Sequence, residues 1–141
     1  MAKSTGKIGY GCWLRIGDGS SPEVYTTILE VFDIGPVGET ASLVEFTHHQ
    51  SPNRAREYKH GLIDGEEVSI IANWVTGNAS QALVRTAFTG ETVDSWQLVT
   101  PDSDDVLTFD AIVTHWDGTW PLDDRSQLSF TLKISGPVTI T

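Results

Sequence analysis

The sequence predicts a mainly β protein, a β-sandwich or barrel-like sheet with one short α-helix on its flank. Apolar and polar residues alternate along several short segments, and glycine, proline, aspartate or asparagine separates one segment from the next. This is the pattern of short strands joined by turns. The period changes from two to about 3.6 residues near residues 78–89, which indicates an amphipathic helix. At 141 residues, the chain has the size of one ordinary domain.

The segment before the helix gives the plainest strand signal. Apolar side chains at Val68, Ile70, Ala72 and Trp74 alternate with Glu67, Ser69, Ile71 and Asn73. This period of two predicts a strand with one face more apolar than the other. Asp64-Gly65 precedes it, and such a pair favours the positive φ angles of a two-residue hairpin turn. We therefore expect a hairpin that turns at Asp64-Gly65.

The helix has a predicted beginning and end. Asn78 can accept hydrogen bonds from the first backbone N–H groups, and Gln81 stands where it can close a capping box. Gly90 occupies the position of a left-handed C-terminal stop. Apolar residues gather on one stripe of the helix: Leu83, Val84, Ala87 and Phe88. A helix over 78–89 should pack this stripe on the sheet.

The remaining strands follow from the same alternation. Two turns close the last ones: Asp117-Gly118 ends the longest strand, and Gly136-Pro137 ends the strand after it. The predicted strands lie at residues 12–16, 24–27, 29–34, 41–47, 96–100, 106–116 and 128–135. Residues 1–10 contain two glycines and few apolar groups, so we expect a flexible N-terminal arm before a single domain at 11–141.

Charge and composition exclude several classes of function. The net charge is −10, and no lysine or arginine occurs between Thr86 and Asp124, where nine acids lie. Nucleic-acid binding needs cations at phosphates, so this half should repel DNA. No run approaches the roughly 18 apolar residues of a membrane helix. Cys12 is the only cysteine, which excludes an internal disulfide and fits a reducing cytoplasm.

Residues 48–60, HHQSPNRAREYKH, differ in kind from the rest. They hold one aromatic residue, no large aliphatic residue, and three of the nine basic residues, Arg54, Arg56 and Lys59. Such a segment cannot bury much surface, so we expect a long loop or an extended hairpin arm. Loops of this length are usually functional or disordered.

The sequence contains no pattern that indicates catalysis or a cofactor. No nucleophile motif is present, and the histidines and the acids at 102–105 fit no metal-ligand spacing. Five tryptophans leave one alternative open, a small acidic β-sandwich that binds carbohydrate on exposed tryptophan faces. Trp74 and Trp96 are expected in the core, whereas Trp116 and Trp120 flank a turn and should be more exposed.

Several stretches, read in order, resemble one protein family. They are LRIGDGSSPEVYTTILEV (14–31), EFTHHQSP (45–52), REYKHGLIDGEEVSI (56–70), FDAIVTHW (109–116) and LDDRSQLSFTLKISGPVTI (122–140). Together they resemble the major tail tube protein of long-tailed, non-contractile, lambda-like bacteriophages, over nearly the whole chain from residue 11. Some relatives carry an additional C-terminal immunoglobulin-like domain, which we do not expect here.

The resemblance implies a non-enzymatic virion protein, made in the host cytoplasm, that needs no cofactor or metal. Its subunits would form hexameric rings that stack into a tube, with one sheet of each subunit contributing to a continuous inner β-barrel. Partners implied are the protein itself, a tail tip or initiator protein, a tape measure protein and a tail terminator. DNA would pass through without specific binding, and no membrane is involved.

The resemblance also gives two groups of residues an expected role. The loop would reach neighbouring subunits, through His48, His49, Gln50, Ser51, Pro52, Asn53, Arg54, Arg56 and Lys59. Acids on the inner wall would keep the duplex from adhering to it, and the candidates are Glu66, Glu67, Asp110 and Asp117. The carbohydrate-binding alternative assigns these residues no role.

Overall fold

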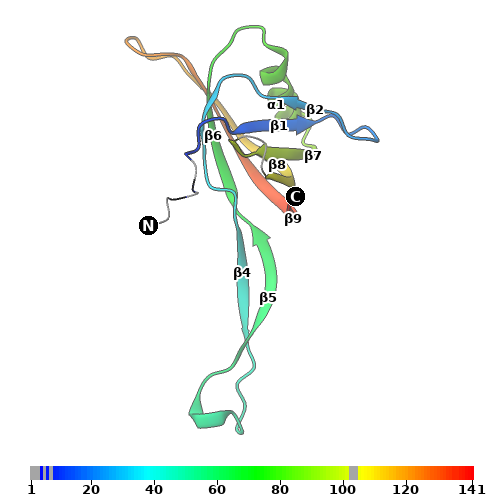
Figure 1. Ribbon diagram of the computed structural model, residues 1–141, viewed down its shortest axis with the longest axis vertical. Coiled ribbons are helices and arrows are strands. Elements are labelled where there is room, and N and C mark those ends of the chain that lie inside the picture. Colours follow the sequence, from blue (N-terminus) through cyan, green and yellow to red (C-terminus); the bar gives the residue numbers. More distant parts are fainter. Residues whose placement is uncertain (1–3, 5, 7, 102–104) are drawn as a thin grey trace.

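A computed structural model describes residues 4, 6, 8–101 and 105–141. Of the predicted N-terminal arm, residues 1–3, 5 and 7 therefore lie outside the described residues, as does most of the acidic turn before residue 106. The described chain has a body, built on one large sheet and one α-helix, and a long two-stranded projection (Figure 1). No helix within this described part is long and apolar enough to cross a membrane.

The body is a seven-stranded sheet in which all neighbouring strands pair antiparallel, in the order β2-β1-β7-β8-β9-β6-β3. The strands are β1 (Trp13–Gly17), β2 (Tyr25–Thr27), β3 (Val31–Ile34), β6 (Glu67–Asn73), β7 (Val93–Val99), β8 (Val106–Thr119) and β9 (Gln127–Ile140). Residues 28–30 alone join the two edge strands, β2 and β3. Because so short a link spans only about 13 Å, the sheet must curve until its edges approach each other.

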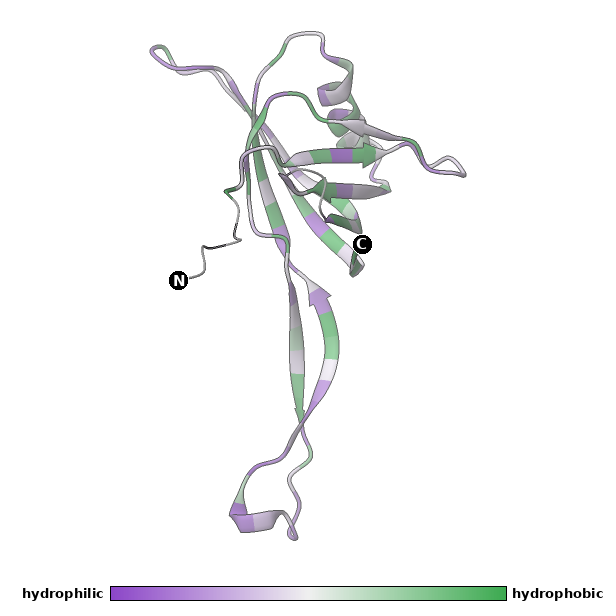
Figure 2. Ribbon diagram, in the orientation of Figure 1, coloured by the Kyte–Doolittle hydropathy of each residue, from purple (hydrophilic) through white to green (hydrophobic). Residues whose placement is uncertain are grey.

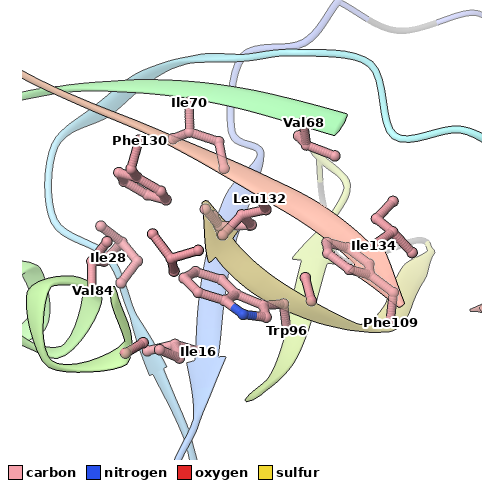
Figure 3. Packing of buried hydrophobic residues seen from close by; sticks show 14 of the residues in the cluster. Ile16, Ile28, Val68, Ile70, Val84, Trp96, Phe109, Phe130, Leu132 and Ile134 are labelled. Atoms are coloured by element: carbon pink, nitrogen blue, oxygen red, sulfur yellow. The ribbon is translucent and has the colours of Figure 1, made fainter. Parts of the chain in front are cut away.

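The core lies on the concave side of this sheet, beneath α1 (Ala79–Thr89) (Figure 3). Its largest buried side chains are Trp96, Phe109 and Phe130. The predicted alternation is confirmed on three strands: buried residues fall at every second position along β6, the middle of β8 and the first half of β9. Val84 and Ala87 of α1 are buried against them, whereas Leu83 is 40% exposed.

The helix begins as predicted, but one detail of its cap is wrong. The Oδ1 atom of Asn78 accepts from the backbone N–H groups of Ser80, at 3.0 Å, and Gln81, at 3.2 Å. The Gln81 side chain does not close a capping box. Its Nε2 donates to the backbone oxygens of Leu29 and Asn73, and its Oε1 accepts from a backbone N–H of the preceding loop. Buried Gln81 therefore ties α1 to the body.

Two predicted turns are wrong, because the glycines serve close packing. Asp64-Gly65 ends β5 (Tyr58–Gly65), and the chain runs on into β6 without a hairpin. Gly65 is buried, and a Cβ there would lie 2.6 Å from the Cβ of Ile134. Asp117-Gly118 stays within β8, where an added Cβ at Gly118 would meet the ring of Trp120 at 2.6 Å.

Two further predicted stops are displaced. Gly136-Pro137 does not end β9, because a register shift opposite Thr108–Asp110 absorbs the extra residues, and Gly136 takes a φ of +94° there. Gly90 is right-handed at the end of α1, with φ −79°. The left-handed residue is Glu91, with φ 53°. Strand β9 thus continues past its predicted end, whereas α1 ends at Thr89 as predicted and only the left-handed conformation moves one residue on.

Candidate functional site: the hairpin arm and the polar face of the sheet

The most prominent feature outside the body is the hairpin arm, residues 39–65. Strands β4 (Glu39–Glu45) and β5 pair only with each other, in a separate two-stranded sheet. Figure 1 shows this ribbon extending away from the body, with a short 3-10 helix, Pro52–Arg54, at its far end. Glu66 anchors the base, where its N–H donates to Gly38 O at 3.0 Å. Of the two alternatives predicted for residues 48–60, a long loop or an extended hairpin arm, the structure shows the hairpin arm.

Both faces of the hairpin arm expose apolar side chains. Cross-strand partners share a face: Leu43 lies opposite His60, and Val44, on the other face, lies opposite Lys59. The arm's exposed apolar residues are Leu43 (68%), Val44 (45%), Phe46 (50%), Tyr58 (50%), Leu62 (87%) and Ile63 (58%), and Figure 2 shows hydrophobic stretches along both strands. A two-stranded ribbon is marginally stable by itself in water, so this arm is suited to insertion between other surfaces.

The tip of the arm has its own hydrogen-bonded structure. The Ser51 hydroxyl accepts from the backbone N–H of His48 at 3.0 Å and donates to Glu57 Oε2 at 2.7 Å. His48 Nδ1 lies 3.2 Å from the same carboxylate oxygen, and the Glu57 N–H donates to Thr47 Oγ1 at 2.9 Å. These bonds give the tip a defined shape without an apolar core.

The residues predicted to contact other subunits all lie at this end of the arm. Arg54 and Arg56 are exposed at the tip, and Lys59 lies in β5 with its Nζ atom 4.7 Å from the Phe46 ring centre. Residues 46–60 carry three cations and one carboxylate, a net charge of +2 with histidine counted as neutral. The remainder of the chain then carries −12. The arm therefore presents a basic end on an acidic protein.

The opposite, convex face of the sheet is polar. Glu67 on β6 pairs with Lys133 on β9, and Asp110 on β8 pairs with Ser135. Asp117 pairs with Ser129, which lies on the same polar side of β9. Three of the four acids predicted for an inner wall thus share one face, rich in serine and threonine. Lys133 is its counter-charge, 3.4 Å from Asp64.

Glu66 is the fourth predicted acid, and it lies elsewhere. It lies between β5 and β6, outside both strands, and its Oε1 accepts from the Thr40 hydroxyl at 2.7 Å. The structure therefore places Glu66 at the base of the hairpin arm and not on the polar face.

Most of the tryptophan rings pack against other side chains and do not form an open surface on which a sugar could stack. Trp74 packs edge-on against Trp116, with ring centres 5.7 Å apart, and against Trp120, at 5.0 Å. The Arg85 guanidinium lies over the Trp116 ring, 4.6 Å from its centre, so that face is already occupied. Trp96 is fully buried. Trp120 is 61% exposed, as predicted, but its neighbours Trp74 and Trp116 are packed or covered, so one open ring gives little support for a sugar-stacking platform.

Asp18 is a titratable group with a clearly shifted pKa, and it stabilises a turn and lies in no candidate catalytic site. Asp18 accepts from the hydroxyl and N–H of Ser20 and from the N–H of Val24, and these bonds hold the pKa of its carboxyl below the ordinary value. They order the β1–β2 turn. Within the residues that the structure describes, no group of three or more histidine, cysteine, aspartate or glutamate side chains could hold a metal ion.

Sequence reasoning missed the apolar surface of the arm. The sequence predicts a strand at 41–47 without indicating which side is buried, and Val44 and Phe46 are both exposed. A signal was present: Leu43, Val44 and Phe46 place large apolar residues on both faces of one strand. A strand at the rim of a body with one core needs only one apolar face.

Comparison with solved structures shows the same fold in tubes. The tail of an empty gene transfer agent particle, computed with C6 symmetry, is 16% identical, with a TM-score of 0.78, and the match covers 96% of this chain and 99% of that one. The SPP1 tail tube is 13% identical, with a TM-score of 0.71, and the match covers 95% of this chain and 78% of that one. The sheath–tube complex of an extracellular contractile injection system is 9% identical, with a TM-score of 0.71, covering 99% of each.

The curated proteins contain no match to the chain. The family model of the lambda phage tail tube protein, however, matches residues 13–141, which includes both the body and the hairpin arm. The chain therefore belongs to the lambda phage tail tube protein family, as a structural component of the virion tail and not an enzyme.

Proposed function

We propose that the chain assembles with copies of itself into hexameric rings, which stack into a tube through which DNA leaves the particle. The observation that carries this proposal is the hairpin arm, which projects from the body with apolar residues exposed on both faces. Such a ribbon gains stability when other surfaces cover its apolar side chains, and other copies of the same chain can supply those surfaces. The sixfold gene transfer agent tail, whose subunit shares this fold, supports six subunits per ring.

The polar face of the sheet is the proposed inner wall of the tube. It carries Glu67, Asp110 and Asp117 among serine and threonine side chains. A wall of small polar groups and carboxylates offers phosphates few cations to bind. DNA would then pass without adhering, and without sequence-specific contacts.

The proposal extends to partners at the ends and in the channel of the tube. A tail tip or initiator protein would start polymerisation, a tape measure protein would fill the channel, and a terminator would close the far end. Support comes from the fold likeness to the cap that terminates the tube of the anti-feeding prophage, with a TM-score of 0.73 at 10% identity.

Negative-stain electron microscopy of the purified chain at rising concentration tests the proposal. We expect rings or tubes to form above a critical concentration. A matched variant with Leu43→Ser and Phe46→Ser, both on the arm and outside the body core, should keep its circular dichroism spectrum but remain monomeric. Dispersed monomers of the unmodified chain at all concentrations, together with glycan binding, would favour the carbohydrate-binding alternative.

A further inference from the structure

An open groove of about 840 Å³ lies beside the β3 edge of the sheet. Residues 9–14 form one wall, and residues 27–34 form the other. Large apolar side chains line it and remain exposed: Tyr10 (87%), Trp13 (50%), Leu29 (42%) and Phe32 (42%). Its volume falls within the roughly 300–1,000 Å³ of binding pockets, and an exposed aromatic patch of this kind marks an interaction surface.

The chain's own hairpin arm does not cover this groove. The arm leaves the body just after β3 and then extends away from it (Figure 2). Its two strands pair with each other, and their apolar side chains stay exposed. The molecule thus has an uncovered apolar ribbon and an uncovered apolar groove that cannot meet within one subunit.

We propose that the groove seats the hairpin arm of a second copy of this chain. This inference rests on the proposed self-assembly and names the surface that receives the arm. The arm's strands would lie along the exposed edge of β3, which pairs with β6 on one side only. A free strand edge is a ready template for an added strand.

Charge favours the same pairing. Glu30 and Asp33 line the groove, on a body with a net charge of −9 outside residues 39–65, and the approaching tip carries +2. Arg125 already stacks on Phe32 at 4.0 Å, and Arg15 stacks on Trp13 at 5.3 Å. Those two ring faces are therefore occupied, and Arg54 and Arg56 of the arriving arm are left to meet the carboxylates of Glu30 and Asp33.

The areas involved are sufficient. At about 25 cal/mol per Å², a buried aliphatic side chain worth about 1.5–3 kcal/mol corresponds to roughly 60–120 Å². The six exposed apolar residues lie on both faces of the arm, so one groove covers about half of them and withdraws roughly 250 Å² from water. A standard stable interface buries about 800 Å² per partner, so the apolar side chains supply about a third of that area, and polar and backbone contacts along β3 supply the rest.

Cys12 makes the inference directly testable. It is the only cysteine of the chain and it lines the groove. A second cysteine on the arm can bond to it only if the two Cα atoms come within about 4.4–6.8 Å. Single substitutions at exposed positions along the arm and its tip, Ser42→Cys, Glu45→Cys, Thr47→Cys and Gln50→Cys, scan the possible seating.

Each variant is assembled, checked for tubes by electron microscopy, oxidised, and run on a non-reducing gel. We expect a ladder of covalent multimers from one or two positions, lost when Cys12→Ser is added. Thr89→Cys, exposed on α1 and far from the arm, should give no ladder through Cys12.

Three results would overturn the inference: tubes with no ladder at any position, a ladder that survives Cys12→Ser, or a disulfide within a single subunit. In each of these cases the tubes still form, so the proposed function stands. If the unmodified chain forms no tubes at all, the proposed function itself fails, and the inference fails with it.

Discussion

Reversing the charge at the tip of the hairpin arm should separate folding from assembly. The variant carries Arg54→Glu and Arg56→Glu, at two exposed positions beyond the end of both strands. Each change moves the local charge by two units, so residues 46–60 go from +2 to −2. Neither side chain belongs to the core, so the body should fold unchanged.

The size of the effect follows from the exposure of the two arginines. An exposed ion pair contributes about 0–1 kcal/mol, and two unit charges 4 Å apart in water interact by about 1 kcal/mol. Losing two attractions and adding repulsion should cost about 2 kcal/mol per contact. Because about 1.4 kcal/mol is a factor of ten, the critical concentration for tube formation should rise about 30-fold. Alanine at both positions should raise it only about fivefold.

Sedimentation of tubes at a series of concentrations measures this quantity. The circular dichroism spectrum and the melting temperature of the monomer should match those of the unmodified chain. The difference between the variants should shrink at about 1 M salt, where screening acts within about 3 Å. If the double reversal assembles at the unmodified critical concentration, the tip charge does not contribute to adhesion, and apolar packing or backbone pairing must suffice.

A complementary variant provides the matched control. Glu30→Lys with Asp33→Lys reverses the acids of the groove, and it should also assemble poorly by itself. In a mixture of the two variants, the basic groove of the groove variant can bind the acidic arm of the arm variant. The acidic groove of the arm variant can in turn bind the basic arm of the groove variant. Assembly should then recover in the mixture. Failure to recover would place the tip's partner outside the groove.

Three further changes test other parts of the molecule. Glu67→Lys with Asp110→Lys, on the polar face, should leave tubes intact but slow DNA release from particles, whereas Glu66→Lys at the arm base should not; equal release rates would contradict an inner wall there. Gly65→Ala should destabilise the monomer by about 1–3 kcal/mol in urea unfolding, because its Cβ would lie 2.6 Å from a core side chain. Asn78→Ala should cost about 1 kcal/mol in the same assay, because two N–H groups of α1 lose their acceptor.

The strands and the helix could be predicted because burial imposes a period. Val68 and Ile70 are buried while Glu67 and Ser69 are exposed, so the alternation reports the core directly. Asn78 caps α1 for a local reason, since its acceptor atom and both donors lie within four residues. Features decided by nearby residues or by a single buried face are the ones that a sequence displays.

The glycines could not be assigned in the same way. Glycine serves a left-handed turn and a close backbone approach equally well, and the sequence does not tell the two apart. Gly65 and Gly118 were predicted as turns, yet each makes room for a side chain from a distant segment, Ile134 or Trp120. Only the packed structure shows which neighbour needs the space.

The polar face was partly predictable for a related reason. Glu67 and Asp110 alternate with buried neighbours, so their side of the sheet follows once the core is known. Glu66 lies outside a strand, where alternation gives no guidance, and its partner Thr40 is 26 residues away in sequence. Contacts between subunits decide which side of the sheet faces a channel. The alternation of buried and exposed residues within one chain does not report those contacts.

The proposed assembly gives the apolar strands and the basic tip of the hairpin arm different roles. The arm's apolar residues are spread over both faces of a narrow ribbon, so no single broad patch invites indiscriminate contact. In the proposed assembly, the acidic body repels other bodies through its net charge of −9 outside residues 39–65, and the basic tip is attracted to them. We therefore expect contact to begin at the tip, and the apolar strands to be buried after the tip has aligned them. Apolar area then provides most of the adhesion, and charge decides which surfaces meet first.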